Sequence, residues 1–549
     1  MAQIKKTLAF TGGVLAAASA VAQTPKQPNI VVIMADDMGW SDIGAYGSEI
    51  STPNIDALAE QGIKFTNFQV SPYSSPSRAM FLTGTDPHRA GLGGLYELNT
   101  PDQAASPNYA GRLNPQSITV AQRLQQAGYY TVASGKWHLG KREQDAPSSW
   151  GFDRSFVLLN GEANHFRHDD EQASPDGRDV YRENGKTAEM PFNVYSSDFY
   201  TDYLIRQLDG KPAGKPLFAY LAFTAPHSPL QAPEADIAKY RDFYHEGPQH
   251  LAARRVQNIN HLQLFEKTVA VPQLAGVKKW ADLSEEERIG ETRRMQIYAA
   301  MIDNMDQNIG RLKNELQKRG ELDNTVFLFL ADNGAAGASR EKSKKWGGWI
   351  ANMRDNSLSN MGKGSSYVST GAAWAQASNA PFALFKGFTA EGSVRSPLIV
   401  SGKGIGKGID RSFRNMADLM PTLLDIAGAD LVTPEGKNAP DGRSFAVSLS
   451  KPQAATQGAQ TPYALEMRGG RQVQLGRFKA RYLSRQPMGL PSETLAVGRW
   501  QLFDVIDDPA ESRDLAAQYP EKLAELVAHY RDYAKRVGTV ELDSPDLPQ

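Results

Sequence analysis

The fold follows from the stretch NIVVIMADD at residues 29–37 and from its counterpart TVFLFLADN at residues 325–333. Each begins with a run that is almost entirely apolar and contains β-branched or aromatic side chains. Such short continuous runs predict strands of a parallel sheet that helices cover on both faces. Each run ends in a polar pair, and ligands of open α/β sheets bind beyond the carboxyl ends of the strands. We therefore expect the two pairs to face one crevice.

These pairs offer four oxygen-bearing side chains, Asp36, Asp37, Asp332 and Asn333. Carboxylate and amide oxygens favour a hard divalent cation, which makes calcium a better candidate than zinc or copper and leaves magnesium as an alternative. Any one such pair is commonly just a turn at the end of a strand. Two pairs, each after a buried strand, favour a metal site instead.

Further apolar runs predict strands at residues 129–133, 217–223 and 397–401, and helical spacing occurs at residues 53–61, 117–127 and 298–319. This alternation predicts an α/β fold, a three-layer sandwich with a mostly parallel central sheet. The Gly-, Ser- and Asn-rich residues 341–379 are expected to form a long loop near the mouth of the site. A composition change at residues 451–461 predicts a linker. Strand-like runs at 463–467 and 479–483 and a helix at 520–537 then predict a smaller C-terminal α+β domain. We thus divide the chain into a catalytic domain, residues 23–455, and a C-terminal subdomain, residues 456–549.

Composition limits the possible partners and the compartment. The 549 residues hold 60 Lys and Arg against 61 Asp and Glu, a net charge of -1, so no bulk charge points to nucleic acid or to a membrane surface. Cysteine is absent, which excludes disulfides and thiolate chemistry. Lys5 and Lys6, a short apolar stretch and Ala20-Val21-Ala22 predict a signal peptide over residues 1–22. We expect a periplasmic or secreted protein without a membrane span.

The most informative motif is Ser74-Ser75-Pro76-Ser77-Arg78, followed by Leu82-Thr83-Gly84. It resembles the signature of the formylglycine-dependent sulfatases of the alkaline phosphatase superfamily, in the serine-type form and with an insertion similar to that of the bacterial arylsulfatase branch. Other pieces occur in family order, from Asn29 to about Leu515. They are GKWHLG at 135–140, APH at 225–227, ADNG at 331–334, KGFTAEG at 386–392 and WQLFD at 500–504.

The resemblance implies hydrolysis of a sulfate monoester to an alcohol or phenol and sulfate. A maturation enzyme would oxidise Ser74 to formylglycine, whose hydrate attacks sulfur with one hydroxyl and expels sulfate with the other. Ser74 would then join the calcium ligands Asp36, Asp37, Asp332 and Asn333. The remaining residues implied by the resemblance are Arg78, which stabilises the hydrate, Lys136 and Lys386, which grip sulfate oxygens, His138, the base of the elimination, and His227, which assists the leaving group. Lys136, His227 and Lys386 would contact the substrate.

Several alternatives stay open at this stage. A phosphonate monoester or phosphodiester hydrolase would use the same core, and a catalytically dead protein that binds sulfated ligands would keep the cationic residues. A serine phosphotransferase fits less well, because the extra metal ligands cannot be placed. A native Ser74 and an engineered replacement of cysteine look identical in the sequence. The substrate, a small-molecule or carbohydrate sulfate ester, and the oligomeric state stay undetermined.

Some remaining residues have ordinary interpretations. His88 matches a family histidine, and we expect it to support the structure rather than to touch substrate. The charge-rich residues 285–294 are expected to form a solvated helix face. Five residues are possible members of an aryl pocket, although packing or loop roles are favoured for each: Tyr73, Trp137, His165, His168 and Trp374.

Overall fold

The computed structural model describes residues 27–167, 174, 175, 177–453, 457–484, 490 and 495–542. Its centre is an 11-stranded sheet in the order β10-β2-β9-β8-β1-β7-β3-β4-β5-β6, with β11 also paired to β2. The five adjacent strands β8, β1, β7, β3 and β4 run parallel to one another. Strand β9 is antiparallel to β8, β5 is antiparallel to β4, and β6 is antiparallel to β5. The strands are β1 Asn29–Ala35, β2 Ile63–Gln69, β3 Tyr130–Lys136, β4 Arg154–Leu158, β5 Tyr181–Glu183, β6 Lys186–Ala188, β7 Leu217–Ala222, β8 Thr325–Ala331, β9 Arg395–Gly402, β10 Gly408–Asp410 and β11 Arg414–Asn415.

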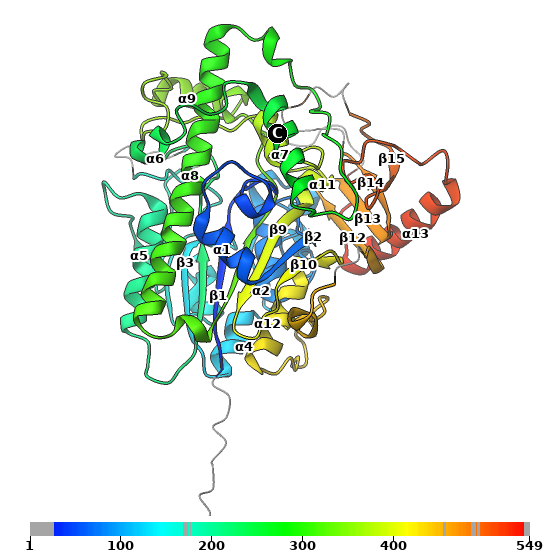
Figure 1. Ribbon diagram of the computed structural model, residues 1–549. Coiled ribbons are helices and arrows are strands. Elements are labelled where there is room, and N and C mark those ends of the chain that lie inside the picture. The colour runs from blue at the N-terminus through cyan, green and yellow to red at the C-terminus, as the bar shows by residue number, and fades with distance from the viewer. Residues whose placement is uncertain are drawn as a thin grey trace, which may run out of the picture.

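Helices cover both faces of this sheet, as Figure 1 shows. Alternate residues of β1 point to opposite faces: Val31 and Ile33 join one buried cluster, whereas Ile30 and Val32 join the other. The first cluster is completed by α1, α5, α7, α8 and α10, and the second by α2, α4 and α12. These helices are α1 Pro53–Gln61, α2 Ser74–Thr83, α4 Val120–Gln126, α5 Ser196–Asp209, α7 Gly247–His261, α8 Glu285–Lys318, α10 Ala372–Ser378 and α12 Leu419–Ala427. The predicted three-layer α/β sandwich is confirmed.

A separate antiparallel sheet forms near the C-terminus in the order β12-β13-β14-β15. Its strands are β12 Ala459–Met467, β13 Gly470–Gly476, β14 Phe478–Tyr482 and β15 Trp500–Asp504, and α13 Pro520–Val537 packs on it around Val473, Leu502 and Leu526. In Figure 1 this unit lies beside the β2 and β10 edge of the central sheet. Side-chain hydrogen bonds from Gln69 of β2 to Gln474 and from Gln472 to Gln69 join the two sheets.

The structure corrects three expected elements. Residues 341–379 are not one long loop, because α9 Gly347–Met353 and α10 lie within them, and a small cluster of Trp346, Ile350 and Tyr367 gives α9 an apolar surface to pack on. The predicted linker at 451–461 already contains the start of β12, and its residues 454–456 lie outside the described residues. The helix predicted from residue 298 begins at Glu285, with Ser284 capping it through the backbone N–H of Glu287.

The charge-rich residues 285–294 are thus the first turns of α8. Glu285, Glu286 and Glu287 are exposed as expected, but Arg294 is not a purely solvated residue, since it donates hydrogen bonds to the Glu341 carboxylate and to the Ser369 carbonyl. The remaining short helices are α3 Pro101–Ala104, α6 Glu234–Ala238 and α11 Glu391–Val394.

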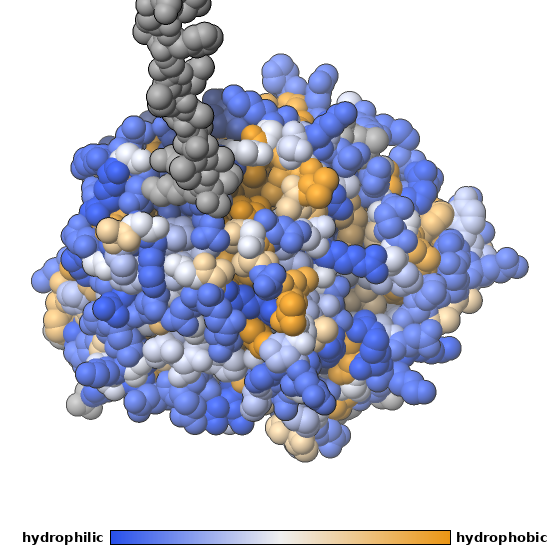
Figure 2. All heavy atoms as spheres, turned by 90° about the horizontal axis from the view of Figure 1, so that it is seen from below, coloured by the Kyte–Doolittle hydropathy of each residue, from blue (hydrophilic) through white to orange (hydrophobic). Residues whose placement is uncertain are grey.

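The surface is mainly hydrophilic where Figure 2 views the molecule from below, with apolar side chains in small separate groups. Within the part of the chain that the structure describes, no helix combines the length and apolarity required to cross a membrane. The predicted signal peptide, residues 1–22, falls outside the described residues.

Candidate active site

The two polar pairs of the sequence meet at one edge of the sheet, because β1 and β8 are adjacent parallel strands that pair Ala35 with Ala331. Asp36 and Asp37 follow β1, and Asp332 and Asn333 follow β8, and all four side chains are buried. The backbone N–H of Asp37 donates to Asp332 Oδ1 at 3.3 Å, and Asn333 Nδ2 donates to Asp37 Oδ1 at 2.6 Å. All four predicted ligands therefore lie together at this edge of the sheet, where they form the candidate site.

Ser74 completes this pocket from the first position of α2. Its hydroxyl lies 3.2 Å from Asp36 Oδ1 and 3.2 Å from Asn333 Oδ1, so it bridges the ends of both strands. The positive end of the α2 dipole also points at this position, where it favours negative charge.

Three cationic side chains surround the carboxylates. Arg78, one turn after Ser74, donates from Nε and Nη2 to Asp332 Oδ2 at 2.9 and 2.7 Å, and from Nη1 to the Lys136 carbonyl at 3.0 Å. Lys136 Nζ lies 2.7 Å from Asp36 Oδ2. Lys386 Nζ lies 2.6 Å from Asp37 Oδ1. Each predicted carboxylate ligand thus has its own cation.

These cations influence the titration of the pocket. Burial alone would raise the pKa of Asp37, but the charges of Lys386 and His227 outweigh it and lower that pKa. For Arg78, burial would lower the pKa, whereas Asp332 outweighs it and raises the pKa. Asp37 and Arg78 therefore stay ionised near neutral pH.

The two predicted histidines have different surroundings. His227 Nε2 lies 3.4 Å from Asp37 Oδ2, and its Nδ1 lies 2.6 Å from the Ser228 carbonyl oxygen, so the ring spans from the pocket to the backbone. His138 adopts a left-handed backbone conformation with φ of 58° just after β3, and its Nδ1 is buried without a hydrogen-bond partner among the described residues. Desolvation, reinforced by the nearby charges of Lys136, Arg78 and Lys386, lowers the pKa of His138 well below its usual range. His138 is therefore a neutral imidazole.

The donor set suits a hard cation. Asp36, Asp37 and His227 bring ligand atoms within 4.8 Å of one another, and Asp332, Asn333 and Ser74 add further oxygens. Asp37 Oδ2 is buried and accepts no hydrogen bond from the described residues. An acceptor of this kind is costly to bury unless a ligand satisfies it, which a bound cation would do.

The four described residues considered for an aryl pocket are packed in the interior. Trp137 donates to the Asp145 carbonyl, His165 bonds Ser196 and the His227 carbonyl, and Trp374 packs against Tyr244 and Trp280. Together with Tyr73 they are at most 2% exposed, so the packing interpretation is confirmed for these four, and His168 lies outside the described residues. His88 is held by Asp86 and Glu466 away from the ligand pairs, which confirms its structural role.

The chain is similar to known proteins in both sequence and fold. The family model described as Sulfatase matches residues 28–429. The chain belongs to the sulfatase family. An uncharacterized sulfatase of Schizosaccharomyces pombe is 38% identical over 545 residues, covering 94% of this chain and 95% of that protein, and an arylsulfatase of Klebsiella aerogenes is 37% identical over 438 residues, covering 78% and 92%. The fold matches a structure of BT4656 in complex with its substrate, D-glucosamine-2-N,6-O-disulfate, with a TM-score of 0.63, 22% identity and coverage of 93% and 98%. This chain is therefore a sulfuric ester hydrolase, as the family match and the identity to the arylsulfatase indicate.

Two residues at the sulfatase pocket escaped the sequence analysis. Glu162 Oε2 lies 3.9 Å from His227 Nε2, and Arg340 Nη2 donates to the same Glu162 oxygen at 3.1 Å. Neither belongs to a motif, and 178 positions separate them in the chain. Only the tertiary fold identifies this pair.

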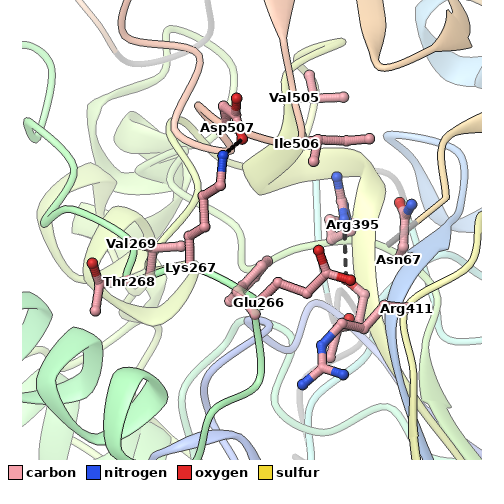
Figure 3. Close-up of a pocket in the computed structure, with 12 residues that line it drawn as sticks. Asn67, Glu266, Lys267, Thr268, Val269, Arg395, Arg411, Val505, Ile506 and Asp507 are labelled. Carbon is pink, nitrogen blue, oxygen red and sulfur yellow. Dashed lines mark hydrogen bonds and ion pairs between the residues drawn. The ribbon is translucent and has the colours of Figure 1, made fainter. Parts of the chain in front are cut away.

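A cavity lies between the 265–269 segment and the 505–507 segment. Figure 3 shows Lys267 reaching across it to Asp507, with Arg395 and Arg411 on the opposite side. None of the predicted site residues lines it.

Proposed function

We propose that the chain hydrolyses sulfate monoesters through a formylglycine derived from Ser74, next to a bound calcium ion. The observation that carries the proposal is the position of the Ser74 oxygen, 3.2 Å from both Asp36 Oδ1 and Asn333 Oδ1. An unmodified serine would be a poor catalyst, since sulfate on its hydroxyl would need a second difficult displacement. The hydrate of a formylglycine supplies one hydroxyl for attack and a second for the expulsion of sulfate.

Calcium would be held by Asp36, Asp37, Asp332, Asn333 and the side chain at position 74. When bound, it supplies a Lewis acid for the nucleophile and for one sulfate oxygen. The oxygen-rich donor set supports calcium, with magnesium as the less favoured ion. Asp37 Oδ2 accepts no hydrogen bond from the described residues and has His227 Nε2 at 3.4 Å, which supports a ligand at that point.

The cations would bind and orient the ester. Lys136 and Lys386 would take sulfate oxygens, because their ammonium groups contact Asp36 and Asp37 beside Ser74. Arg78 would hold the hydrated side chain at position 74, which lies one helical turn before it. Fixed cations of this kind stabilise negative charge that develops during the displacement without any rearrangement.

The histidines would move protons on opposite sides of the ester. His138 would act as the base, because its imidazole is neutral and its Nδ1 is buried without a hydrogen-bond partner among the described residues. His227 would give a proton to the departing oxygen with the help of Lys386, and its contact with Asp37 supports this orientation. A neutral base and a separate donor are what the two halves of the reaction require.

The proposal extends to the cellular setting and to the organisation of the chain. We infer export to the periplasm or beyond, maturation by an external formylglycine-generating enzyme, and a small-molecule or carbohydrate sulfate ester as the substrate. Residues 23–455 would form the catalytic domain, and residues 456–549 the C-terminal subdomain. The BT4656 complex with a disulfated glucosamine supports a carbohydrate ester among these classes.

The test uses the full chain produced together with a serine-competent maturation enzyme. The tryptic peptide with Ser74 should lose two hydrogens, and a panel of sulfate esters should be hydrolysed until a chelator removes the metal. Ser74→Ala should abolish turnover, whereas the matched variant Ser75→Ala should keep it. Phenyl methylphosphonate, a phosphonate monoester, turned over faster than phenyl sulfate would refute the sulfatase chemistry in favour of a phosphonate monoester hydrolase. An unmodified Ser74 in active protein would refute the formylglycine.

A further inference from the structure

We propose that Glu162 and Arg340 form a subsite for the alcohol part of the substrate, which binds hydroxyl groups beside the sulfate ester. The subsite would select hydroxylated alcohols, such as sugars, over aryl and plain alkyl sulfates. This inference rests on the proposed function, because it names the leaving group of that same reaction.

The exposure of the side chains shows where substrate enters. Ser74 is 2% exposed, the Lys386 side chain 15%, Glu162 16% and Arg340 37%. Exposure therefore rises from the nucleophile through Lys386 and Glu162 to Arg340. Since sulfate sits deepest, the alcohol part must pass Glu162 and Arg340 on its way to solvent.

Glu162 lies close to both predicted histidines. The preceding Gly161 packs against His138 so closely that a β-carbon would lie 2.6 Å from Cε1 of the ring. Glu162 itself lies 3.9 Å from His227 Nε2. The same short segment thus touches both histidines, which places the Glu162 carboxylate beside the bond that breaks.

Arg340 is fixed from the other side. Its backbone N–H donates to Ser369 Oγ at 3.1 Å, and the neighbouring Glu341 accepts from the Ser369 hydroxyl and from Arg294 of α8. These hydrogen bonds join residues 340 and 341 to Ser369, so they connect two distant parts of the segment that follows β8. Because Arg294 ties Glu341 to the long helix α8, Arg340 holds a defined position beside Glu162.

The pair offers both kinds of hydrogen-bonding group and no net charge. Only Oε2 of Glu162 has a donor within hydrogen-bond distance among the described residues, so Oε1 is left as an acceptor. A guanidinium carries five N–H donors, and the Arg340 side chain reaches solvent. A donor and an acceptor side by side match a hydroxylated ring.

The described aromatic side chains considered for an aryl pocket offer little surface to an aromatic leaving group. Tyr73, Trp137, His165 and Trp374 are at most 2% exposed. Trp346, whose ring centroid lies 5.0 Å from the Arg340 guanidinium carbon, is only 3% exposed. These five side chains are covered, whereas Glu162 and Arg340 are partly exposed.

The experiment compares substrates that differ only in hydroxyls, using mature full-length enzyme. The probes are cyclohexyl sulfate, trans-1,2-cyclohexanediol monosulfate and glucopyranosides carrying one sulfate at different positions, with phenyl sulfate as the aryl probe. The variants are Glu162→Gln, which keeps the shape of the side chain, and Arg340→Met. Asp209→Asn is the matched control, because Asp209 pairs with Arg319 at the opposite, amino-terminal edge of the strands. Thermal melting checks that each variant folds.

We expect wild type to favour the best hydroxylated probe over cyclohexyl sulfate in kcat/KM. Hydrogen bonds to charged groups are strong enough that Glu162→Gln should reduce this preference about 10- to 100-fold. Turnover of cyclohexyl and phenyl sulfate should fall by a clearly smaller factor than turnover of the best hydroxylated probe, and the control should leave all ratios intact.

Three results would overturn the subsite: no preference in wild type, an unchanged preference in both variants, or equal losses on every probe. Failure of the proposed function is distinguishable, since in that case wild type would hydrolyse none of the sulfate esters, including phenyl sulfate.

Discussion

Gly161 should be the most informative single substitution at the pocket, because its lack of a side chain sets the position of His138. In Gly161→Ala, the new β-carbon would lie 2.6 Å from Cε1 and 2.7 Å from Nε2 of the His138 ring. Carbon atoms pack at about 3.5 Å or more, so the ring or the loop must move by roughly 1 Å. A displacement of this size in a catalytic group can cost about 100-fold in rate.

The assay measures kcat, KM and inhibition by inorganic sulfate with phenyl sulfate as substrate. Phenyl sulfate carries no hydroxyl, so any change at the adjacent Glu162 has little influence on the result. We expect kcat to fall about 100-fold, whereas KM and sulfate inhibition change little because Lys136 and Lys386 keep their places. The loss of stability should be about 1–3 kcal/mol, as for other overpacked sites.

Gly290→Ala is the matched control. Gly290 lies within α8, and a β-carbon there meets no atom within 4 Å. Alanine is the better helix former by about 1 kcal/mol, so this variant should be at least as stable as wild type and fully active. If Gly161→Ala matches Gly290→Ala in kcat, the assignment of His138 as a positioned base is wrong.

Three further outcomes are expected. Burial would lower the pKa of His88, but hydrogen bonds to Asp86 and Glu466 outweigh it and raise the pKa to about 9. Protonated His88 should therefore contribute roughly 3 kcal/mol to the free energy of unfolding below pH 6.5, and this contribution should be lost as pH rises through about 9. Urea unfolding across this range checks it, and His88→Gln should remove the dependence. Calcium at about 1,000 times its Kd should stabilise the apoprotein by about 4 kcal/mol, and full activity after exhaustive chelation would contradict the metal site. Glu391→Gln should cost about 3–5 kcal/mol in urea unfolding, because Arg395 would be left buried without its carboxylate and Lys479 would keep only Glu511; an unchanged midpoint would show that the pairs are dispensable.

The elements that the sequence predicted best are those whose signal is local. The bounds of β1 and β8 follow from continuous apolar runs that end in acidic pairs, and α1 and α13 both begin at a proline, a residue preferred in the first turn of a helix. By contrast, residues 341–379 have the composition of a loop. Helix α9 forms there because Trp346, Ile350 and Tyr367 pack together in one buried cluster. Tertiary packing overrode local preference in that segment.

The same distinction holds at the site. Asp36 and Asp332 could be placed together in advance, because parallel strands present their carboxyl ends on one edge of the sheet. Lys136 and Lys386 came only from the resemblance to sulfatases, since a lone lysine carries no local signal. Glu162 and Arg340 came from neither route, because their meeting depends on how two loops after different strands fold over the edge.

The charges of the pocket explain why ion and substrate belong together. Asp36, Asp37 and Asp332 are matched by Arg78, Lys136 and Lys386, so the protein alone is close to neutral at this point. A dication adds two positive charges in a buried region, where uncompensated charge is costly, and a sulfate monoester returns one negative charge. Each bound partner therefore lowers the cost of binding the other. Because such coupling is reciprocal, a sulfate ester should raise the affinity for the ion by the same factor as the ion raises the affinity for the ester.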